Sequence, residues 1–94
     1  MAFVAEIDVS EIDSPQAAER AVEKLTVIAI EASSIQGYGR TKKLRLIGAK
    51  MEAVRKMCHI YGYDKAKKEL KRVFEILQEA KAEDDKLMTL LFGI

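Results

Sequence analysis

Apolar residues cover a wide arc of the segment 41–61, and this feature constrains the fold more than any other. Two rows of apolar positions recur along the segment at helical spacing. At 100° per residue the rows together sweep roughly 220° of the circumference, whereas a surface helix needs only about 100°. We therefore expect a helix that is central in a bundle or lies in a subunit interface. The rows are Leu44, Ile47, Met51, Val54, Cys58 and Tyr61, and Leu46, Ala49, Ala53, Met57 and Ile60.

The chain is too short to cover such a helix by itself. Its 94 residues make one domain, and 49% apolar with 33% charged residues is typical of a globular chain rather than a disordered one. Helices of about 20 residues are about 30 Å long, and three of them leave part of the wide arc uncovered. We therefore expect a single helical domain over 1–94 that forms a homodimer or a higher oligomer.

The segment 14–35 carries the signals of an amphipathic helix. Ser14 is a favourable N-cap, and Pro15 is suited to the first helical position. Apolar residues then follow the 3, 4, 7 spacing of one helical face. The buried face predicted from this spacing comprises Ala18, Ala21, Val22, Leu25, Ile28, Ala29, Ala32 and Ile35.

Capping residues delimit two further helices. Thr41 is expected to cap the helix over 41–61, and Gly62 is well placed to end it. Asp64 is expected to cap a third helix over 64–82. Because the connecting loops are short, neighbouring helices should be antiparallel, which gives an all-α bundle of three to four helices. The expected buried face of the third helix is Ala66, Leu70, Val73, Phe74, Leu77 and Ala80.

Both ends of the chain leave alternatives open. Residues 3–9 alternate between apolar and other side chains, which predicts a strand within an N-terminal strand or arm over 1–12. A lone strand must pair with a second copy, lie as an extended arm on the helices, or fray. Residues 83–94 are expected to form a short helix or a tail that either folds back or enters a groove of another protein. The expected interface residues are Phe3, Ile7, Leu46, Met57, Ile60, Leu87, Leu91 and Phe92.

The net charge of +1 conceals an uneven distribution along the chain. Residues 1–36 hold two basic against seven acidic side chains, residues 37–72 hold twelve against three, and residues 73–94 hold two against five. A basic centre with a net charge of +9 therefore lies between two acidic ends. Either these blocks neutralise one another within the bundle, or the centre forms an exposed basic surface.

The positions of the basic residues favour binding of nucleic acid. Three cations crowd each of the helix starts at 40–43 and 65–68, where the helix dipole makes them mildly unfavourable and where phosphates bind well. The two starts lie about 30 Å apart, so they suit a nucleic-acid backbone better than one small anion. The GxxxxGK[ST] motif of a P-loop is missing. The expected contacts to DNA or RNA are Tyr38, Arg40, Lys42, Lys43, Arg45, Arg55, Lys56, Lys67, Lys68 and Lys71.

Other functional classes have little support in the sequence. His59 and Cys58 are the only residues of their types, and neighbours on a helix point about 100° apart, so no catalytic triad is expected. One cysteine and one histidine make neither a disulfide nor a zinc site, and we expect no metal or cofactor. The chain is thus expected to be a non-enzymatic nucleic-acid-binding protein. The alternative is a helical protein–protein interaction module, or adaptor, without a nucleic-acid role.

The sequence also bears on where the protein resides. No run of about 18 apolar residues is present, and the first residues carry acidic rather than basic side chains, so neither a membrane helix nor a signal peptide is expected. One unpaired cysteine suits the reducing cytoplasm. Asn is absent and Lys and Glu are abundant, which is a weak tendency of thermophilic proteins.

Overall fold

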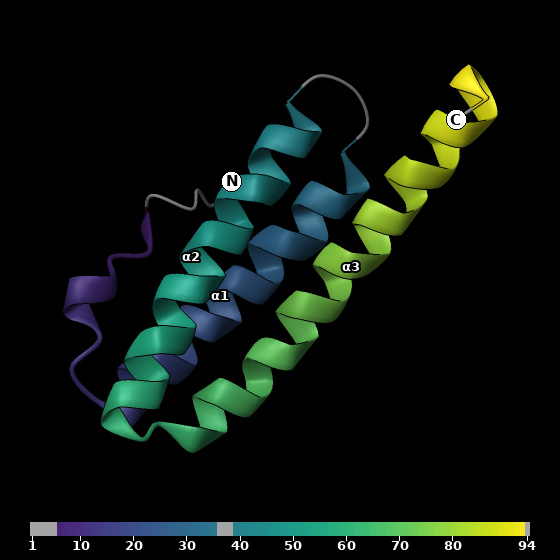
Figure 1. Cartoon of the computed structure of the whole chain (residues 1–94). Coiled ribbons are helices and arrows are strands. Elements are labelled where there is room, and N and C mark those ends of the chain that lie inside the picture. Colours follow the sequence, from purple (N-terminus) through teal and green to yellow (C-terminus); the bar gives the residue numbers. More distant parts are fainter. Residues whose placement is uncertain (1–5, 36–38, 94) are drawn as a thin grey trace.

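The computed structural model describes residues 6–35 and 39–93, which are mostly helical. Three helices pack against one another, each running antiparallel to the next along the chain (Figure 1). The expected helical bundle is confirmed at this level. The elements are a short 3-10 helix η2 (Val9–Glu11) and the helices α1 (Pro15–Ser34), α2 (Arg40–Tyr61) and α3 (Asp64–Phe92).

Helix α1 begins as the sequence predicts. The Ser14 hydroxyl accepts a hydrogen bond from the Ala17 amide at 3.1 Å, and Pro15 occupies the first turn, where no amide donor is needed. The helix ends at Ser34, and Ile35 follows it as the C-cap. Every predicted apolar position inside the helix is buried, namely Ala18, Ala21, Val22, Leu25, Ile28, Ala29 and Ala32.

Helix α2 lies between two glycines in the left-handed backbone region. Gly39 has φ 89° and Gly62 has φ 71°, a conformation that costs glycine little. The N-cap is Gly39, without a side-chain hydrogen bond, so Thr41 lies in the first turn and is not the expected cap. The first apolar row is buried through Ile47, Met51, Val54 and Cys58, whereas Leu46, Ala49 and Ile60 of the second row are exposed.

Helix α3 is longer than predicted, because the acidic cluster around Asp84 does not interrupt it. Its first residue is Asp64 and its N-cap is Tyr63, one residue before the predicted cap. Ile76 is buried where Phe74 was expected, and Phe74 is half exposed at 49%. Among the described side chains of this helix, none beyond Ala80 is buried. Figure 1 shows the C-terminal end of α3 extending past the ends of α1 and α2.

The N-terminal segment lies on the helices without forming a strand over its described part. Residues 1–5 of the expected arm lie outside the described residues, and residues 6–12 contain only 3-10 turns and irregular backbone. The Asp8 carboxylate accepts bonds from the Ser10 amide at 3.0 Å and the Ser10 hydroxyl at 2.6 Å, which lower the pKa of Asp8. Ile7 and Ile12 are buried in the core formed with the three helices. This geometry agrees with the arm alternative.

Candidate nucleic-acid interface

Helices α2 and α3 share one outer surface that is rich in basic side chains. The positions 67, 71, 74, 78 and 81 recur at the spacing of one helical face of α3. That face borders α2, since Lys67 Nζ lies 3.1 Å from His59 Nδ1 and since Gln78 and Lys81 line a groove with residues of α2. We call this surface the α2–α3 face. It comprises Arg45, Glu52, Arg55, Lys56 and His59 of α2 and Lys67, Lys71, Phe74, Gln78, Lys81 and Asp85 of α3, with Lys68 and Glu75 on its outer margin, about 100° and 80° around α3 from Lys67.

The α2–α3 face holds an excess of positive charge. It contains seven lysine and arginine side chains against the three acidic ones, a net charge of +4. Arg45, Lys56, Lys68 and Lys71 are exposed, and the part of the chain that the structure describes contains no ion pair to any of them. Four of the predicted contacts on or beside this face therefore have their charges open to solvent.

Arg55 contributes less charge to this face than its position suggests. Its Nε lies 3.1 Å from both carboxylate oxygens of Glu52, and its Nη2 donates to Glu52 Oε2 at 2.9 Å. These hydrogen bonds lower the pKa of the Glu52 carboxyl and raise the pKa of Arg55, so both groups stay ionised. The pair neutralises one positive charge until a ligand competes for the guanidinium.

Arg40 is engaged inside the protein, away from the α2–α3 face. Its Nη1 donates to the backbone oxygens of Ser33 at 2.6 Å and Ile35 at 3.0 Å, carbonyls left without helical partners at the end of α1. Its Nε lies 3.2 Å from Asp84 Oδ1 and its Nη2 lies 3.6 Å from Glu83 Oε2. The side chain is only 12% exposed, so Arg40 joins α1 to α3 and is not included in the interface.

The remaining predicted contacts are dispersed. Lys42 is exposed near the start of α2, whereas Lys43 is half-buried and lines a hollow with Ile30 and Ser34 of α1. Lys67 is held beside His59 on the α2–α3 face. Tyr38 lies outside the described residues. The two basic helix starts thus do not form one continuous site.

Ion pairs between the helices neutralise the acidic and basic blocks of the chain only in part. Lys65 Nζ lies 3.0 Å from Glu19 Oε1, and this hydrogen bond raises the pKa of Lys65. This pair joins α1 to α3, and the contacts of Arg40 with Glu83 and Asp84 join α2 to α3. Over residues 6–35 and 39–93 no ion pair joins acidic α1 to basic α2, which was the neutralisation expected from the antiparallel order.

Phe74 is a candidate binding residue that the sequence analysis missed. It follows Lys71 and precedes Gln78 on the α2–α3 face, with half of its surface exposed. An exposed aromatic ring among cations offers a stacking surface for an unpaired base. Its position on the helix accounts for this exposure. Phe74 lies about 100° around α3 from Val73, and Val73 is fully buried.

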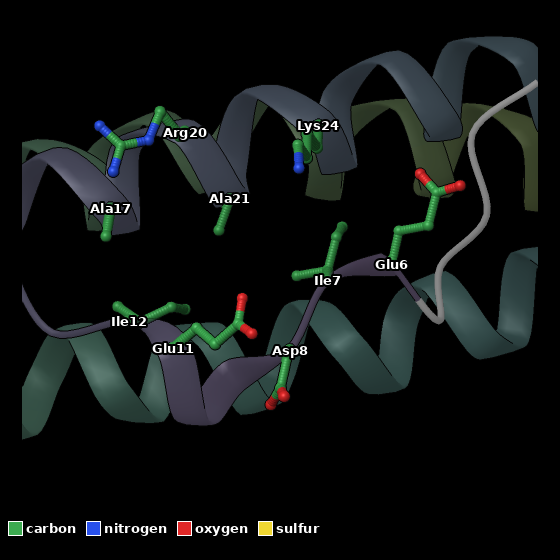
Figure 2. A pocket seen from close by; sticks show the side chains of 9 residues that line it. All are labelled: Glu6, Ile7, Asp8, Glu11, Ile12, Ala17, Arg20, Ala21 and Lys24. Atoms are coloured by element: carbon green, nitrogen blue, oxygen red, sulfur yellow. The ribbon is translucent and has the colours of Figure 1, made fainter.

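A groove and a small pocket are two of the hollows lined by charged residues. The groove, about 600 Å³, lies at one end of the α2–α3 face with Leu44 and Leu77 among its lining residues. Figure 2 shows the pocket, which Arg20 and Lys24 of α1 line together with residues of the N-terminal segment. The pocket measures about 140 Å³, less than the roughly 300 Å³ at which sites for small molecules begin.

The structure gives no support for a metal centre or a membrane helix within the residues that it describes. No group of three or more His, Cys, Asp or Glu side chains suited to a metal ion occurs there. No described helix combines the length and the apolarity required to cross a bilayer. Comparisons with family models, curated proteins and solved structures found no match to this chain.

Proposed function

We propose that this protein binds the backbone of DNA or RNA through the α2–α3 face and is not an enzyme. The observation that carries the proposal is the grouping of Arg45, Lys56, Lys68 and Lys71, all exposed and without ion pairs among the described residues. Lys67 adds a fifth cation beside them. Phosphate contacts supply affinity without requiring a particular base sequence. Phe74 supplies a ring that stacks on a base where the strand is single.

The dimensions of the face suit a polymer of phosphates. On α3 the face runs from Lys67 to Asp85, so it is about 27 Å long. Successive phosphates of one duplex strand are about 3.4 Å apart along the axis, so about eight of them pass along this length. Five cations spread over that distance contact separate phosphates. With five contacts the affinity for duplex DNA should fall about 500-fold between 50 and 200 mM salt.

Charge reversal on the α2–α3 face tests this proposal. The double variant Lys68→Glu/Lys71→Glu should weaken binding of labelled duplex and single strands at least tenfold at low salt, measured by fluorescence anisotropy. The control Arg20→Glu/Lys24→Glu makes the same change in net charge at two exposed cations of α1, off the face, and it should change affinity less than threefold. Equal losses in both variants would show that only net charge matters, and the proposed face would be wrong.

A protein–protein interaction module is the second candidate function. Large apolar side chains are exposed on two helices, including Leu46 and Ile60 of α2 at 52% and 70%. Apolar surface of this kind marks a contact with another protein when it is contiguous. If the protein fails to bind nucleic acid at 50 mM salt, this candidate is favoured. We further propose a homodimer in a reducing cytoplasm, where the buried thiol of Cys58 stays unpaired.

A further inference from the structure

The α2–α3 face combines an exposed aromatic ring with a groove. Phe74 is 49% exposed, and Gln78, four residues further on the same face of α3, lines the groove of about 600 Å³. Leu44 and Leu77 also line the groove, and both pack against the core, so its apolar wall is a fixed part of the bundle. Sites for small ligands measure roughly 300–1,000 Å³, so the groove has room for a nucleobase.

We propose that the α2–α3 face binds single strands in preference to duplexes, with one base stacked on Phe74 and the neighbouring base in the groove. The inference rests on the proposed function, because the phosphates of the strand need the cations of the same face. It goes further by naming unpaired nucleic acid as the ligand. A duplex keeps its bases stacked and paired, so it uses the cations but neither the ring nor the groove.

The spacing of the ring and the groove favours an extended strand. Phe74 and Gln78 are four residues apart, which is about 6 Å along α3. Successive nucleotides of one duplex strand are about 3.4 Å apart along the axis. Neighbouring bases held at the ring and in the groove are therefore unstacked from each other, which a single strand allows and a duplex does not.

Cations lie on both sides of the ring, where they can hold the phosphates of such a strand. Lys71 and Lys67 precede Phe74 by about one and two turns of α3, and Arg45 and Lys81 line the groove beyond it. Proteins that bind single strands combine a row of cations along the backbone with aromatic rings for the bases. The ring and its flanking cations have this arrangement.

Two carboxylates also line the groove, and one of them is open to a base. Asp84 is held by Arg40 at 3.2 Å, whereas Asp85 is exposed and has no ion pair among the described residues. Because a carboxylate repels phosphates, the phosphates lie towards Arg45 and Lys81, and a base lies towards Asp85. The Asp85 carboxylate accepts a hydrogen bond from the exocyclic amine of cytosine, where thymine and uracil carry a carbonyl. We therefore expect a preference for cytosine in the groove.

The variant Phe74→Trp tests stacking at the ring directly, because the chain contains no other tryptophan. A saturating single strand should quench the emission at least twice as strongly as a saturating hairpin duplex does. Leu46→Trp is the matched control, since it carries the same reporter at an exposed leucine of α2 off the face, and neither ligand should quench it. Equal quenching of Phe74→Trp by both ligands would overturn stacking on this ring.

Affinity separates this inference from the proposed function. At 100 mM salt a single strand should bind at least fivefold tighter than a hairpin duplex with the same number of phosphates, measured by fluorescence anisotropy. Phe74→Leu, checked for folding by circular dichroism, should lose at least fivefold in single-strand affinity and less than twofold in duplex affinity, because only the single strand stacks on the ring. Duplex binding as tight as single-strand binding would overturn the inference and leave the proposed function standing, whereas no binding of either would remove both.

Base preference tests the occupant of the groove. Strands of cytosine should bind at least threefold tighter than strands of thymine, and Asp85→Leu should abolish this difference. The matched control Glu79→Leu removes an exposed carboxylate of α3 off the face and should retain it. DNA and RNA strands of cytosine should bind within threefold of each other, because the ring and the groove contact bases. Equal affinity for cytosine and thymine strands, or a larger gap between DNA and RNA, would exclude a base beside Asp85 as the source of the preference.

Discussion

Replacing Arg40 by methionine should destabilise the fold, although the residue resembles a surface cation in the sequence. The substitution retains a long apolar stem and removes only the guanidinium. The backbone oxygens of Ser33 and Ile35 then lose their charged donor, and Asp84 loses its nearest cation. The end of α1 is thereby released from the start of α2 and from α3.

The expected magnitude follows from the exposure of the partners. A hydrogen bond to a charged group contributes about 1.5–3 kcal/mol, and two are lost, but water partly replaces them at the end of α1. Glu83 and Asp84 are 74% and 36% exposed, so the ion pairs add at most about 1 kcal/mol. We expect a net loss of about 2–3 kcal/mol in the free energy of unfolding. For a domain of this size the melting temperature then falls by about 10–20 °C.

Urea unfolding followed by circular dichroism measures this loss. Arg72→Met is the matched control, since Arg72 is exposed and has no ion pair among the described residues, and its effect should stay within about 0.5 kcal/mol. If Arg40→Met lowers the free energy of unfolding no more than the control does, the guanidinium does not join the helices. At a temperature where it is folded, Arg40→Met should bind nucleic acid as the wild type does, unlike Lys68→Glu/Lys71→Glu.

The remaining predictions concern the backbone, the core and the thiol. Gly62→Ala should lower the free energy of unfolding by about 1–2 kcal/mol, because alanine is strained at φ 71°. Gly48→Ala should raise it by about 0.5–1 kcal/mol, because the new Cβ meets only Leu77 Cδ1 at 3.9 Å. Urea unfolding measures both changes. Leu25→Ala should cost about 2–5 kcal/mol in the same assay, because Leu25 is fully buried. Burial raises the pKa of Cys58, so thiol reagents should react with it only on unfolding. Because the folded state holds that proton more tightly, stability should be complete below about pH 8 and fall as the pH rises further, which urea midpoints at several pH values measure. The thermophilic tendency stays a prediction, which a melting temperature above the roughly 45–65 °C of mesophilic domains would support.

Local signals predicted the helices well. Ser14 and Pro15 mark the start of α1 because a cap and a proline act within one turn, and Gly62 ends α2 because only its own backbone angle is involved. The buried face of α1 followed from the spacing of its apolar residues. The extra apolar row of α2 was also real, but Leu46 and Ile60 remain exposed within the described chain instead of packing in its core.

Features that depend on distant residues escaped the sequence analysis. The sequence predicts Arg40 as a phosphate ligand because nothing near it in the chain reveals that Asp84 lies beside it in the fold. Ile76 is buried and Phe74 is half exposed, although the sequence predicts Phe74 on the buried face. The width of the buried face of α3 depends on where α1 packs. Leu87, Leu90 and Leu91 are exposed because α3 extends past the ends of α1 and α2. This difference becomes visible only when the three helices are compared in the fold. Each of these features belongs to the tertiary arrangement.

The salt dependence of nucleic-acid binding tests the central claim most directly. Anisotropy titrations of wild type and Lys68→Glu/Lys71→Glu with a labelled duplex, from 50 to 200 mM salt, give the slope of log affinity against log salt. Five phosphate contacts predict a wild-type slope of about −4.5, and losing two of them reduces its magnitude by about 1.8. An absence of binding at 50 mM salt, or an equal slope for both proteins, would contradict the assignment of the α2–α3 face.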